Sequence, residues 1–232
     1  MTGVQTCALP ISASNAFSFK GGSNLDFDCG AASNSSAANA FSMTSSTWAH
    51  FASLRVVGGM SVAGTLVLDN TPAITNSSPT SNPFTNWKTP NFTKSCDYNK
   101  FSPRKGITLN PGVYCGGLSF GSGSFYMEPG TYIIDQGDFS VSAQAVITGD
   151  GVTIFMTDSS RTKSSDKTGT FVMSGGATVN LSAPLSGSNA LMLFVVDPLS
   201  SVPGAHVIGS ASGEMMGNIY IKKGSLSLAG KT

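Results

Sequence analysis

Three acidic residues, Asp135, Asp138 and Asp150, are the best candidates in this sequence for carrying chemistry. Carboxylates gathered around a sugar act as acid, base or nucleophile in glycoside hydrolases, and polysaccharide lyases combine them with Ca²⁺ and a basic residue. These three could project from neighbouring turns of the chain. Asp138 follows Gly137 and Asp150 precedes Gly151, however, and aspartate beside glycine commonly caps a turn. We therefore expect turn-capping roles and predict no catalytic residue.

Other chemical motifs do not stand out. His50 and His206 are isolated histidines among apolar or small residues, and no Gly-x-Ser-x-Gly sequence supplies a nucleophile. No cysteine or histidine spacing typical of a zinc site occurs, and no glycine pair is followed by the Lys-Ser/Thr of a phosphate loop. We expect both histidines to be structural, and we predict neither a bound metal nor a cofactor.

Two groups of residues could bind a ligand. Trp87 and Tyr98 could form an aromatic platform for sugars, although they could equally pack their own segment onto the rest of the protein. Arg104 and Lys105 belong to a small basic cluster that could contact anionic glycans or lipid headgroups, or could simply be solvated. With a net charge of +1 and no recognisable motif, the sequence predicts no nucleic-acid partner.

The cysteines point to a compartment. Cys96 and Cys115 would close a loop of about 20 residues, a cross-link that stabilises a folded chain by about 3 kcal/mol. Such a bond fits an oxidising, extracytoplasmic environment. The alternative is that the cysteines are buried free thiols, which is what we expect for Cys29.

The secondary structure that positions these residues is predicted from the amino-acid composition and from the alternation of apolar and polar residues. Charged residues make up only 11% of the chain, and 27 of its 232 residues are glycine. Apolar runs are short and alternate with Ser, Thr or Asn, as in Gly137–Ala143 and Gly224–Gly230. This period of two is typical of strands, and no helical stripe or membrane-length apolar run occurs. The sequence therefore predicts an all-β protein.

Imperfect internal repeats refine this prediction. Ala16–Phe27 realigns on Ala40–Phe51 at an offset of 24 residues, and Asn110–Tyr114 realigns on Glu128–Tyr132 at an offset of 18. These offsets match one turn of a parallel β-helix, in which each turn covers the apolar interior of the next. We predict a single-stranded parallel β-helix, right-handed like most parallel crossovers. An antiparallel β-sandwich is the alternative.

The domain organisation follows from the interruptions in this pattern. Residues 1–12 resemble a translated sequencing adapter and are expected to be disordered and not native. The β-helix is expected to span 13–230, with a proline-rich excursion at about 71–105 on its outside and a polar loop at about 156–170.

Several motifs resemble a bacterial family. The runs Leu109–Leu118, Pro129–Ile134 and Gly149–Phe155, with Phe27–Ser36 before them, are similar to the C-terminal region of TadG-like proteins of the Tad/Flp pilus-assembly system. The resemblance implies an envelope location, an N-terminal membrane anchor and a role in pilus assembly, adhesion or surface attachment. The Cys96 and Cys115 pair is consistent with the two-cysteine pattern of that family. The segment Thr71–Lys94 is longer than the family pattern implies.

We therefore expect a non-catalytic structural or adhesive module of the cell envelope, extracytoplasmic and anchored to a membrane. Its expected partners are other pilus-assembly or envelope proteins, or surface glycans. Two alternatives are a pectate-lyase-like or glycoside-hydrolase β-helix enzyme and an adhesin unrelated to pili.

Overall fold

The computed structural model describes residues 5–8, 13–22, 24–69, 72–93, 95–160, 166–201, 204–209 and 213–229; for 5–8, 205 and 207 it describes the backbone only. All regular structure in these residues is β-strand. The strands are β1 (Gln5–Ala8), β2 (Phe17–Lys20), β3 (Asn24–Ser33), β4 (Phe41–Met43), β5 (Trp48–Val56), β6 (Met60–Val62), β7 (Thr65–Leu68), β8 (Tyr98–Phe101), β9 (Thr108–Leu109), β10 (Gly112–Phe120), β11 (Gly123–Met127), β12 (Gly130–Asp135), β13 (Phe139–Val141), β14 (Ala145–Gly149), β15 (Val152–Thr157), β16 (Phe171–Met173), β17 (Thr178–Ser182), β18 (Met192–Val196), β19 (Gly204–Gly209), β20 (Met215–Met216), β21 (Asn218–Tyr220) and β22 (Gly224–Ala229).

Parallel pairing is the common feature of these strands. β12 pairs with β15 from Gly130–Val152 to Asp135–Thr157, and β11 pairs with β14 in the same sense. Every strand pairing among the described residues is parallel, including those of the N-terminal half. The all-β prediction and the parallel pairing are confirmed, and the facing antiparallel layers of a sandwich are not what the described strands form.

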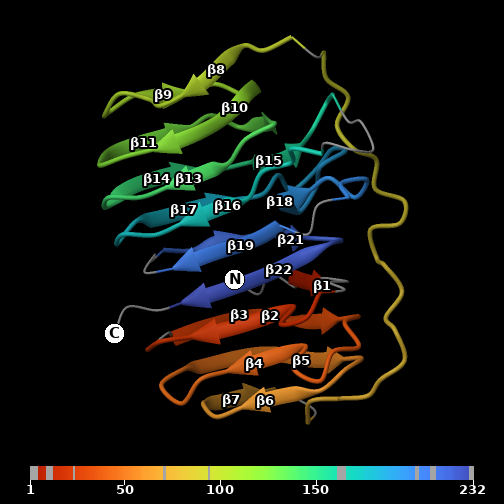
Figure 1. The fold of residues 1–232 in the computed structure, drawn as a ribbon. Coiled ribbons are helices and arrows are strands. Elements are labelled where there is room, and N and C mark those ends of the chain that lie inside the picture. The colour runs from red at the N-terminus through yellow and green to blue at the C-terminus, as the bar shows by residue number, and fades with distance from the viewer. Residues whose placement is uncertain are drawn as a thin grey trace.

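The strands stack in levels, which we call rungs (Figure 1). In the C-terminal half a rung contains three successive strands, one on each of three faces. The first face contains β12, β15, β18 and β21; the second contains β13, β16, β19 and β22; the third contains β9, β11, β14, β17 and β20. β10 bends between two faces, since its start pairs with β12 and its end pairs with β13.

Glycine allows the chain to turn between the first two faces. A Cβ atom on Gly137 would lie 2.3 Å from the carbonyl carbon of Gly116 in the rung above, and one on Gly169 would collide with the backbone of Gly137. Because backbones meet this closely at the corner, only glycine fits there. Gly137 and Gly169 are thus close-packing positions between neighbouring rungs.

The interior is a single apolar column. Alternate residues of each strand point inward, as the burial of β14 and β22 shows, and rings from successive rungs contact one another. Phe120 and Phe139 have ring centroids 5.6 Å apart, and Tyr114 stacks between Tyr98 at 4.5 Å and Tyr132 at 5.9 Å. Each rung therefore removes the inner face of its neighbours from water, which is the main stabilising term of such a stack.

The order of the rungs does not follow the order of the chain. β22, the last strand, pairs with β2 through four residue pairs, from Phe17–Leu226 to Lys20–Ala229. β4 and β6 then continue the same face beyond β2. The C-terminal rungs and the N-terminal rungs thus grow away from a common junction in the middle of the stack (Figure 1).

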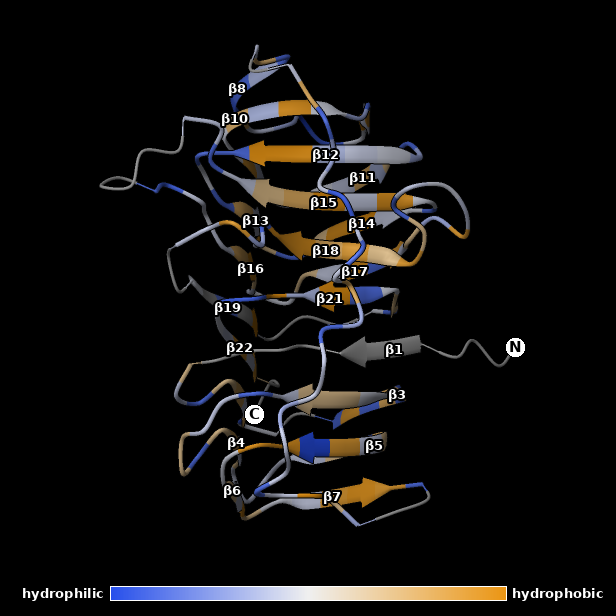
Figure 2. Cartoon of the chain, turned by 90° about the vertical axis from the view of Figure 1, so that its right-hand side faces the viewer, coloured by the Kyte–Doolittle hydropathy of each residue, from blue (hydrophilic) through white to orange (hydrophobic). Residues whose placement is uncertain are grey.

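Residues 72–97, which we call the strap, connect the two far ends of the stack. The strap leaves after β7 and crosses the outside of the first face to β8 (Figures 1 and 2). Along this path Thr80 exchanges two hydrogen bonds of 2.8 Å with the Asn34 side chain, and Asn82 donates to the Tyr220 hydroxyl at 2.8 Å. A disulfide between Cys96 and Cys115 fixes its far end.

The strap buries a second apolar cluster on the outer side of the first face. Phe84 lies against Tyr220 at 5.1 Å, and Trp87 lies against Phe155 at 6.0 Å. Beneath the strap the first face is apolar on both sides, so β15 and β18 are buried along their whole length. The outward residues covered in this way are Val113, Ile133, Phe155, Met192, Val195 and Tyr220.

Two expectations concern the remaining segments. Cys29 was expected to be a buried thiol, and this is wrong: Cys29 is buried and disulfide-bonded, to a partner outside the described side chains.

Of residues 1–12, the structure describes only the backbone of Gln5–Ala8, which pairs with β3. The rest of that segment lies outside the described residues, as do residues 161–165 of the polar loop. No helix that could cross a membrane occurs in the described part of the chain.

Removing the disulfide tests how firmly the strap holds the stack together. We expect Cys96→Ser with Cys115→Ser to lower the free energy of unfolding by about 3 kcal/mol, because the bond closes a loop of 19 residues in sequence separation. Urea unfolding of the variant and of the native protein, with and without reductant, measures this. A reductant effect of equal size in the variant would show that the Cys96–Cys115 bond is not the one responsible.

Candidate functional site

The three carboxylates proposed from the sequence do not meet. Asp135 lies at the end of β12, where it pairs with Thr157, whereas Asp150 immediately precedes Gly151 and β15 and therefore lies at the opposite edge of the first face. Asp138 is exposed and accepts a 2.7 Å hydrogen bond from the Thr170 amide, and Asp150 accepts one of 2.7 Å from the Ser182 hydroxyl. Each bridges neighbouring rungs, so the catalytic cluster of the enzyme alternative is not assembled by these residues.

The structure gathers a different set of acidic residues. Asp135, Asp158 and Asp197 are all buried, and they lie at or just after the carboxyl ends of β12, β15 and β18. Thr157 connects two of them, since it pairs with Asp135 and its hydroxyl donates to Asp197 at 2.6 Å. Parallel strands bring their ends to one edge of the sheet, which places residues distant in sequence side by side.

These buried carboxylates accept hydrogen bonds from loop backbone. Asp135 accepts from the Ser159 amide at 2.7 Å, and Asp158 accepts from the amides of Ser160 at 2.9 Å and Lys167 at 2.7 Å. Burial raises the pKa of Asp158, but the hydrogen bonds from Lys167 and Ser160 outweigh it and hold that pKa below its usual value. Asp135 and Asp158 therefore act as anchors that position the loop after β15.

A pocket of about 420 Å³ lies between these anchors and the strap. Strap residues Thr89–Phe92 form one wall, and Phe155 with the residues that follow it forms the other. Asp158, Asp197, Ser159 and Ser160 line it, so its chemistry is that of hydroxyls and carboxylates around one aromatic wall. Such a lining suits a polyhydroxylated ligand held by hydrogen bonds.

The residues predicted to bind a ligand are dispersed. Trp87 packs against Phe155 beneath the strap, and Tyr98 stacks on Tyr114 at the end of the apolar column. Arg104 and Lys105 are exposed in the loop between β8 and β9. The aromatic platform and the basic cluster do not form one surface, and Trp87 and Tyr98 serve mainly to pack the structure.

His206 is a fully buried histidine in β19. Its ring stacks on Phe171 at 4.4 Å, and its Nδ1 accepts a 3.2 Å hydrogen bond from the Phe171 amide. Burial lowers the pKa of His206 to about 4, so the ring is neutral at physiological pH. The structural role expected for this residue agrees with its position in the core.

Acid should destabilise the protein through His206. Its pKa in the unfolded chain is near the ordinary value of 6.5, so the unfolded state binds the proton first and stability falls as the pH drops from 6.5 to about 4. The difference corresponds to about 3 kcal/mol. We expect the free energy of unfolding of His206→Leu to change less between pH 7 and pH 4 than that of the native protein, as measured by urea unfolding. The control His50→Gln should show the same decrease in stability with falling pH as the native protein. An unchanged decline in His206→Leu would contradict the assignment.

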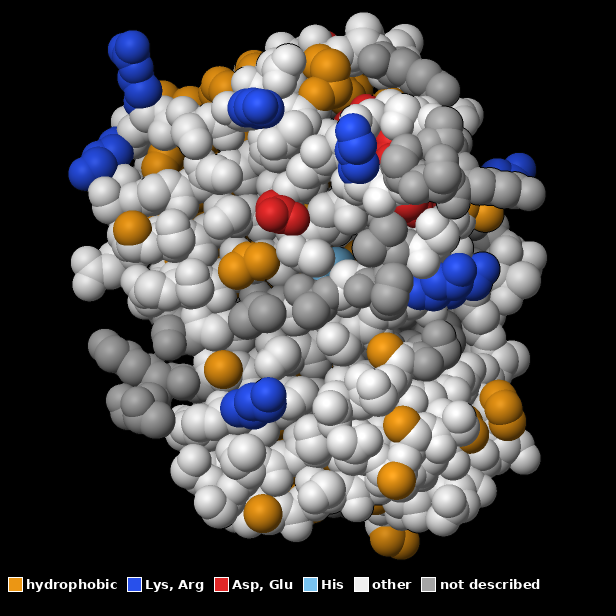
Figure 3. Space-filling model, viewed as in Figure 1, with side chains coloured by type: hydrophobic (Ala, Val, Ile, Leu, Met, Phe, Trp, Pro, Cys, Tyr) orange, Lys and Arg blue, Asp and Glu red, His pale blue; other side chains and the backbone are white. Residues whose placement is uncertain are grey.

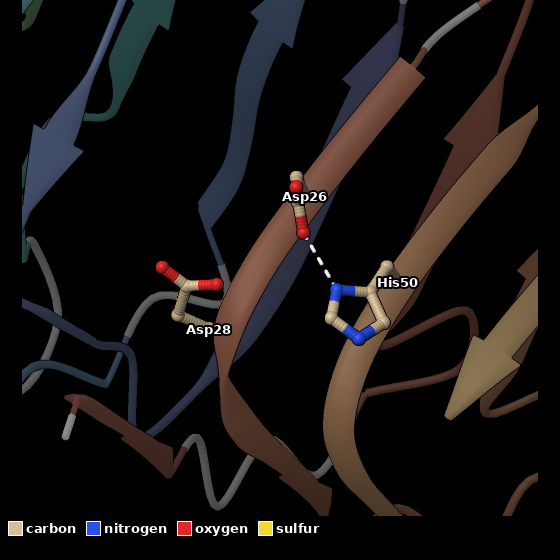
Figure 4. A group of neighbouring side chains, drawn as sticks. All are labelled: Asp26, Asp28 and His50. Atoms are coloured by element: carbon tan, nitrogen blue, oxygen red, sulfur yellow. Dashed lines mark hydrogen bonds and ion pairs between the residues drawn. The ribbon is translucent and has the colours of Figure 1, made fainter. Parts of the chain in front are cut away.

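His50 lies on the outer surface in a charged cluster that the sequence analysis missed. Its Nδ1 is 2.6 Å from Asp26 Oδ1, and its Nε2 is 2.7 Å from Asp69 Oδ1 (Figure 4 shows the first contact). A protonated imidazole donates from both ring nitrogens and a carboxylate accepts, so these two contacts favour the protonated form of His50. The hydrogen bonds to Asp26 and Asp69 accordingly raise the pKa of His50. The interpretation of His50 as isolated is wrong, and the 24-residue repeat already aligned it with Asp26.

Two members of this cluster, Asp26 and His50, also belong to the one group among the described residues whose ligand atoms lie close enough to hold a metal ion. One ligand atom from each of Asp26, Asp28 and His50 lies within 4.8 Å of the other two. Asp28 lies on the other side of the Asp26 carboxylate from His50 (Figure 4). The imidazole already donates to both of its carboxylate neighbours, so the geometry is that of an ion-pair network across three rungs.

Removing one carboxylate should change the titration of His50 selectively. Asp26→Asn replaces an anionic acceptor with a neutral amide, and we expect the pKa of His50 to fall towards 6.5 while that of His206 stays low. NMR titration of the two histidine side chains measures both values in one sample. Because the raised pKa favours the folded state only while His50 is protonated, the native protein should lose this contribution as the pH rises through that pKa. Equal His50 titrations in both proteins would refute the ion-pair network.

Comparison with known proteins identifies no relative. No protein-family model matches the chain, and neither a curated protein nor a solved structure matches it.

Proposed function

We propose that the chain is a single-stranded, right-handed parallel β-helix that serves as a non-catalytic structural or adhesive module of the bacterial envelope. We further propose that it takes part in Tad/Flp pilus assembly or in surface attachment, as its resemblance to TadG-like proteins implies. Its partners in this role are other envelope or pilus-assembly proteins, or surface glycans. In the intact protein a membrane anchor would hold it outside the cytoplasm.

The strap is the observation that best supports a mechanical role. It crosses the whole stack, buries an apolar cluster beneath it and ends in a disulfide. A stack of rungs is open at both ends, and rungs separate most easily there. A cross-connection between the two end rungs opposes this separation, which suits a module that transmits force or displays a surface.

The chemistry of the polar residues is consistent with such a module. The buried aspartates hold loop backbone, and the disulfide indicates an oxidising, extracytoplasmic environment. On the face seen in Figure 3, most of the surface carries neither charge nor large apolar patches.

Complementation in a bacterium that carries this gene tests the proposal. We expect deletion to reduce both pilus number, counted by electron microscopy, and attachment to a solid surface. The native gene should restore both, and so should Asp138→Asn, a turn substitution. Cys96→Ser with Cys115→Ser, which frees the strap, should restore less of either.

The same strains distinguish the alternatives. Restored attachment with unchanged pilus number would indicate an adhesin unrelated to pili and would reject the pilus role. Cleavage of pectate or of a cell-surface polysaccharide by the purified protein, abolished by Asp135→Asn, would indicate the carbohydrate-active enzyme and would reject the non-catalytic role.

A further inference from the structure

Both ends of the stack present a strand edge that is unpaired among the described residues. The lower end in Figure 1 is formed by β6 and β7, and the upper end is formed by β8 and β9. In the described sheets β6 pairs only with β4 and β7 only with β5, while β8 pairs only with β10 and β9 only with β11. All four strands are internal segments of the sequence, so neither end of the stack depends on where the sequence begins or stops.

The backbone at the β6–β7 end has hydrogen-bonding groups that point away from the stack. In a parallel ladder, alternate residues of a strand bond to the neighbour on one side. The Thr65 amide donates to the Thr47 carbonyl at 2.9 Å. The Asp69 amide donates in the same direction, to the Phe51 carbonyl at 3.3 Å. The amide and carbonyl of Leu66 therefore face the open side, where no described strand follows β7.

The β8–β9 end has a free edge of the same kind. The Ile107 carbonyl accepts a 3.3 Å hydrogen bond from the Tyr126 amide. The Leu109 carbonyl accepts one of 3.0 Å from the Glu128 amide. Thr108 lies between these two residues, so its own amide and carbonyl face the open side of β9. Unpaired edge groups of this kind are a template for pairing with another strand.

The apolar column is only partly covered at both ends. At the β6–β7 end Val62 is 40% exposed, whereas Met43, its partner in the next rung, is 3% exposed. At the β8–β9 end Phe101 is partly exposed, whereas its partner Leu118 is 0% exposed. A further rung over either end would bury these side chains, and the burial of apolar surface favours association.

A second copy of this chain supplies a matching rung at each end. β7 follows β6 as third-face strands follow second-face strands elsewhere, so in a second copy stacked in the same orientation β9 would continue the face of β7. The end of β8 would continue the face of β6, because Phe101 pairs with the second-face part of β10. All strands would then run parallel, as β22 and β2 do where two distant parts of this chain already meet.

Charge favours this head-to-tail arrangement over a contact between two like ends. Lys100, Arg104 and Lys105 are exposed at the β8–β9 end and outnumber the carboxylate of Asp97. In Figure 3, Lys and Arg side chains gather towards this upper end. Asp69 is the only charged residue in the sequence from the start of β6 to the start of the strap. Two β8–β9 ends would therefore repel each other, whereas the β6–β7 end carries the opposite charge.

We infer that the two ends form one self-association site, through which copies of this chain stack head to tail, the β6–β7 end of one copy on the β8–β9 end of the next. A contact between two different surfaces leaves one of each free, so it generates a linear filament. The end strands are short, and the association is accordingly weak and reversible. It is a property of the chain itself and is independent of the proposed envelope role.

Sedimentation velocity and small-angle X-ray scattering of the purified protein test this inference. The useful concentrations run from about 10 μM to about 1 mM, which bracket the affinity of a small interface. We expect the average mass to rise with concentration while the particles lengthen at a constant cross-section. Growth of the cross-section would show association through the sides of the stack, and a monomer at every concentration would show no association. Either result would overturn the inference.

Two variants block the ends separately. Val62→Lys with Val67→Lys adds two cations at exposed positions of the β6–β7 end. It should weaken association roughly tenfold or more, because these cations would face the basic end of the next copy. Its matched control, Leu185→Lys with Leu199→Lys, makes the same change at exposed loop positions and should associate like the native protein. Thr108→Pro removes the outward amide of β9 without breaking its pairing with β11, and should weaken association to a similar extent. Urea unfolding verifies that each variant is folded.

Mixing the two blocked variants separates head-to-tail stacking from its alternatives. At a concentration where the native protein associates, each variant alone should stay monomeric, and the mixture should form dimers and nothing longer. Association of Thr108→Pro alone would indicate contact between two β6–β7 ends. Association of the Val62→Lys and Val67→Lys variant alone would indicate contact between two β8–β9 ends. Either result, or a mixture that stays monomeric, would overturn the head-to-tail site.

Discussion

Parallel pairing between β22 and β2 is the contact on which the rest of the structure depends. It joins the last strand of the chain to an early one, and without it the two groups of rungs would each expose an apolar end. Because each rung is stable only when its neighbours cover it, this single junction makes one core out of two. The strap connects the two ends of the stack along its outer surface, because β7 lies at one end and β8 at the other (Figure 1).

The strap also explains why the first face is so apolar. A sheet with one face in solvent alternates apolar and polar residues, as Ser225–Leu228 of β22 do, whereas β15 and β18 are buried along their whole length. Phe84, Trp87 and Phe92 supply the covering layer. The aromatic residues of the strap are thus part of a second core, and the polar groups at its edge, Asp158 and Asp197, hold the loops that border it.

The two histidines show how position in the stack decides chemistry. His206 points into the core, where burial lowers its pKa, and His50 points outward between carboxylates of the rungs on either side, which raise its pKa. The outer side of the N-terminal rungs therefore carries an ion-pair network that links three neighbouring rungs through Asp26, His50 and Asp69.

The sequence by itself determined the all-β class, the stacking period and the interruption of the pattern by the proline-rich segment, because alternation and turn residues are local properties of the chain. The 24-residue repeat even placed Asp26 level with His50. Only the tertiary structure decided that the rungs are stacked out of chain order, and that Asp135, Asp158 and Asp197 share an edge while Asp138 and Asp150 lie apart. These features depend on which strand edges meet in space, and backbone hydrogen bonds between parallel strands are the same for any pair of segments, so the residues alone do not specify the partner.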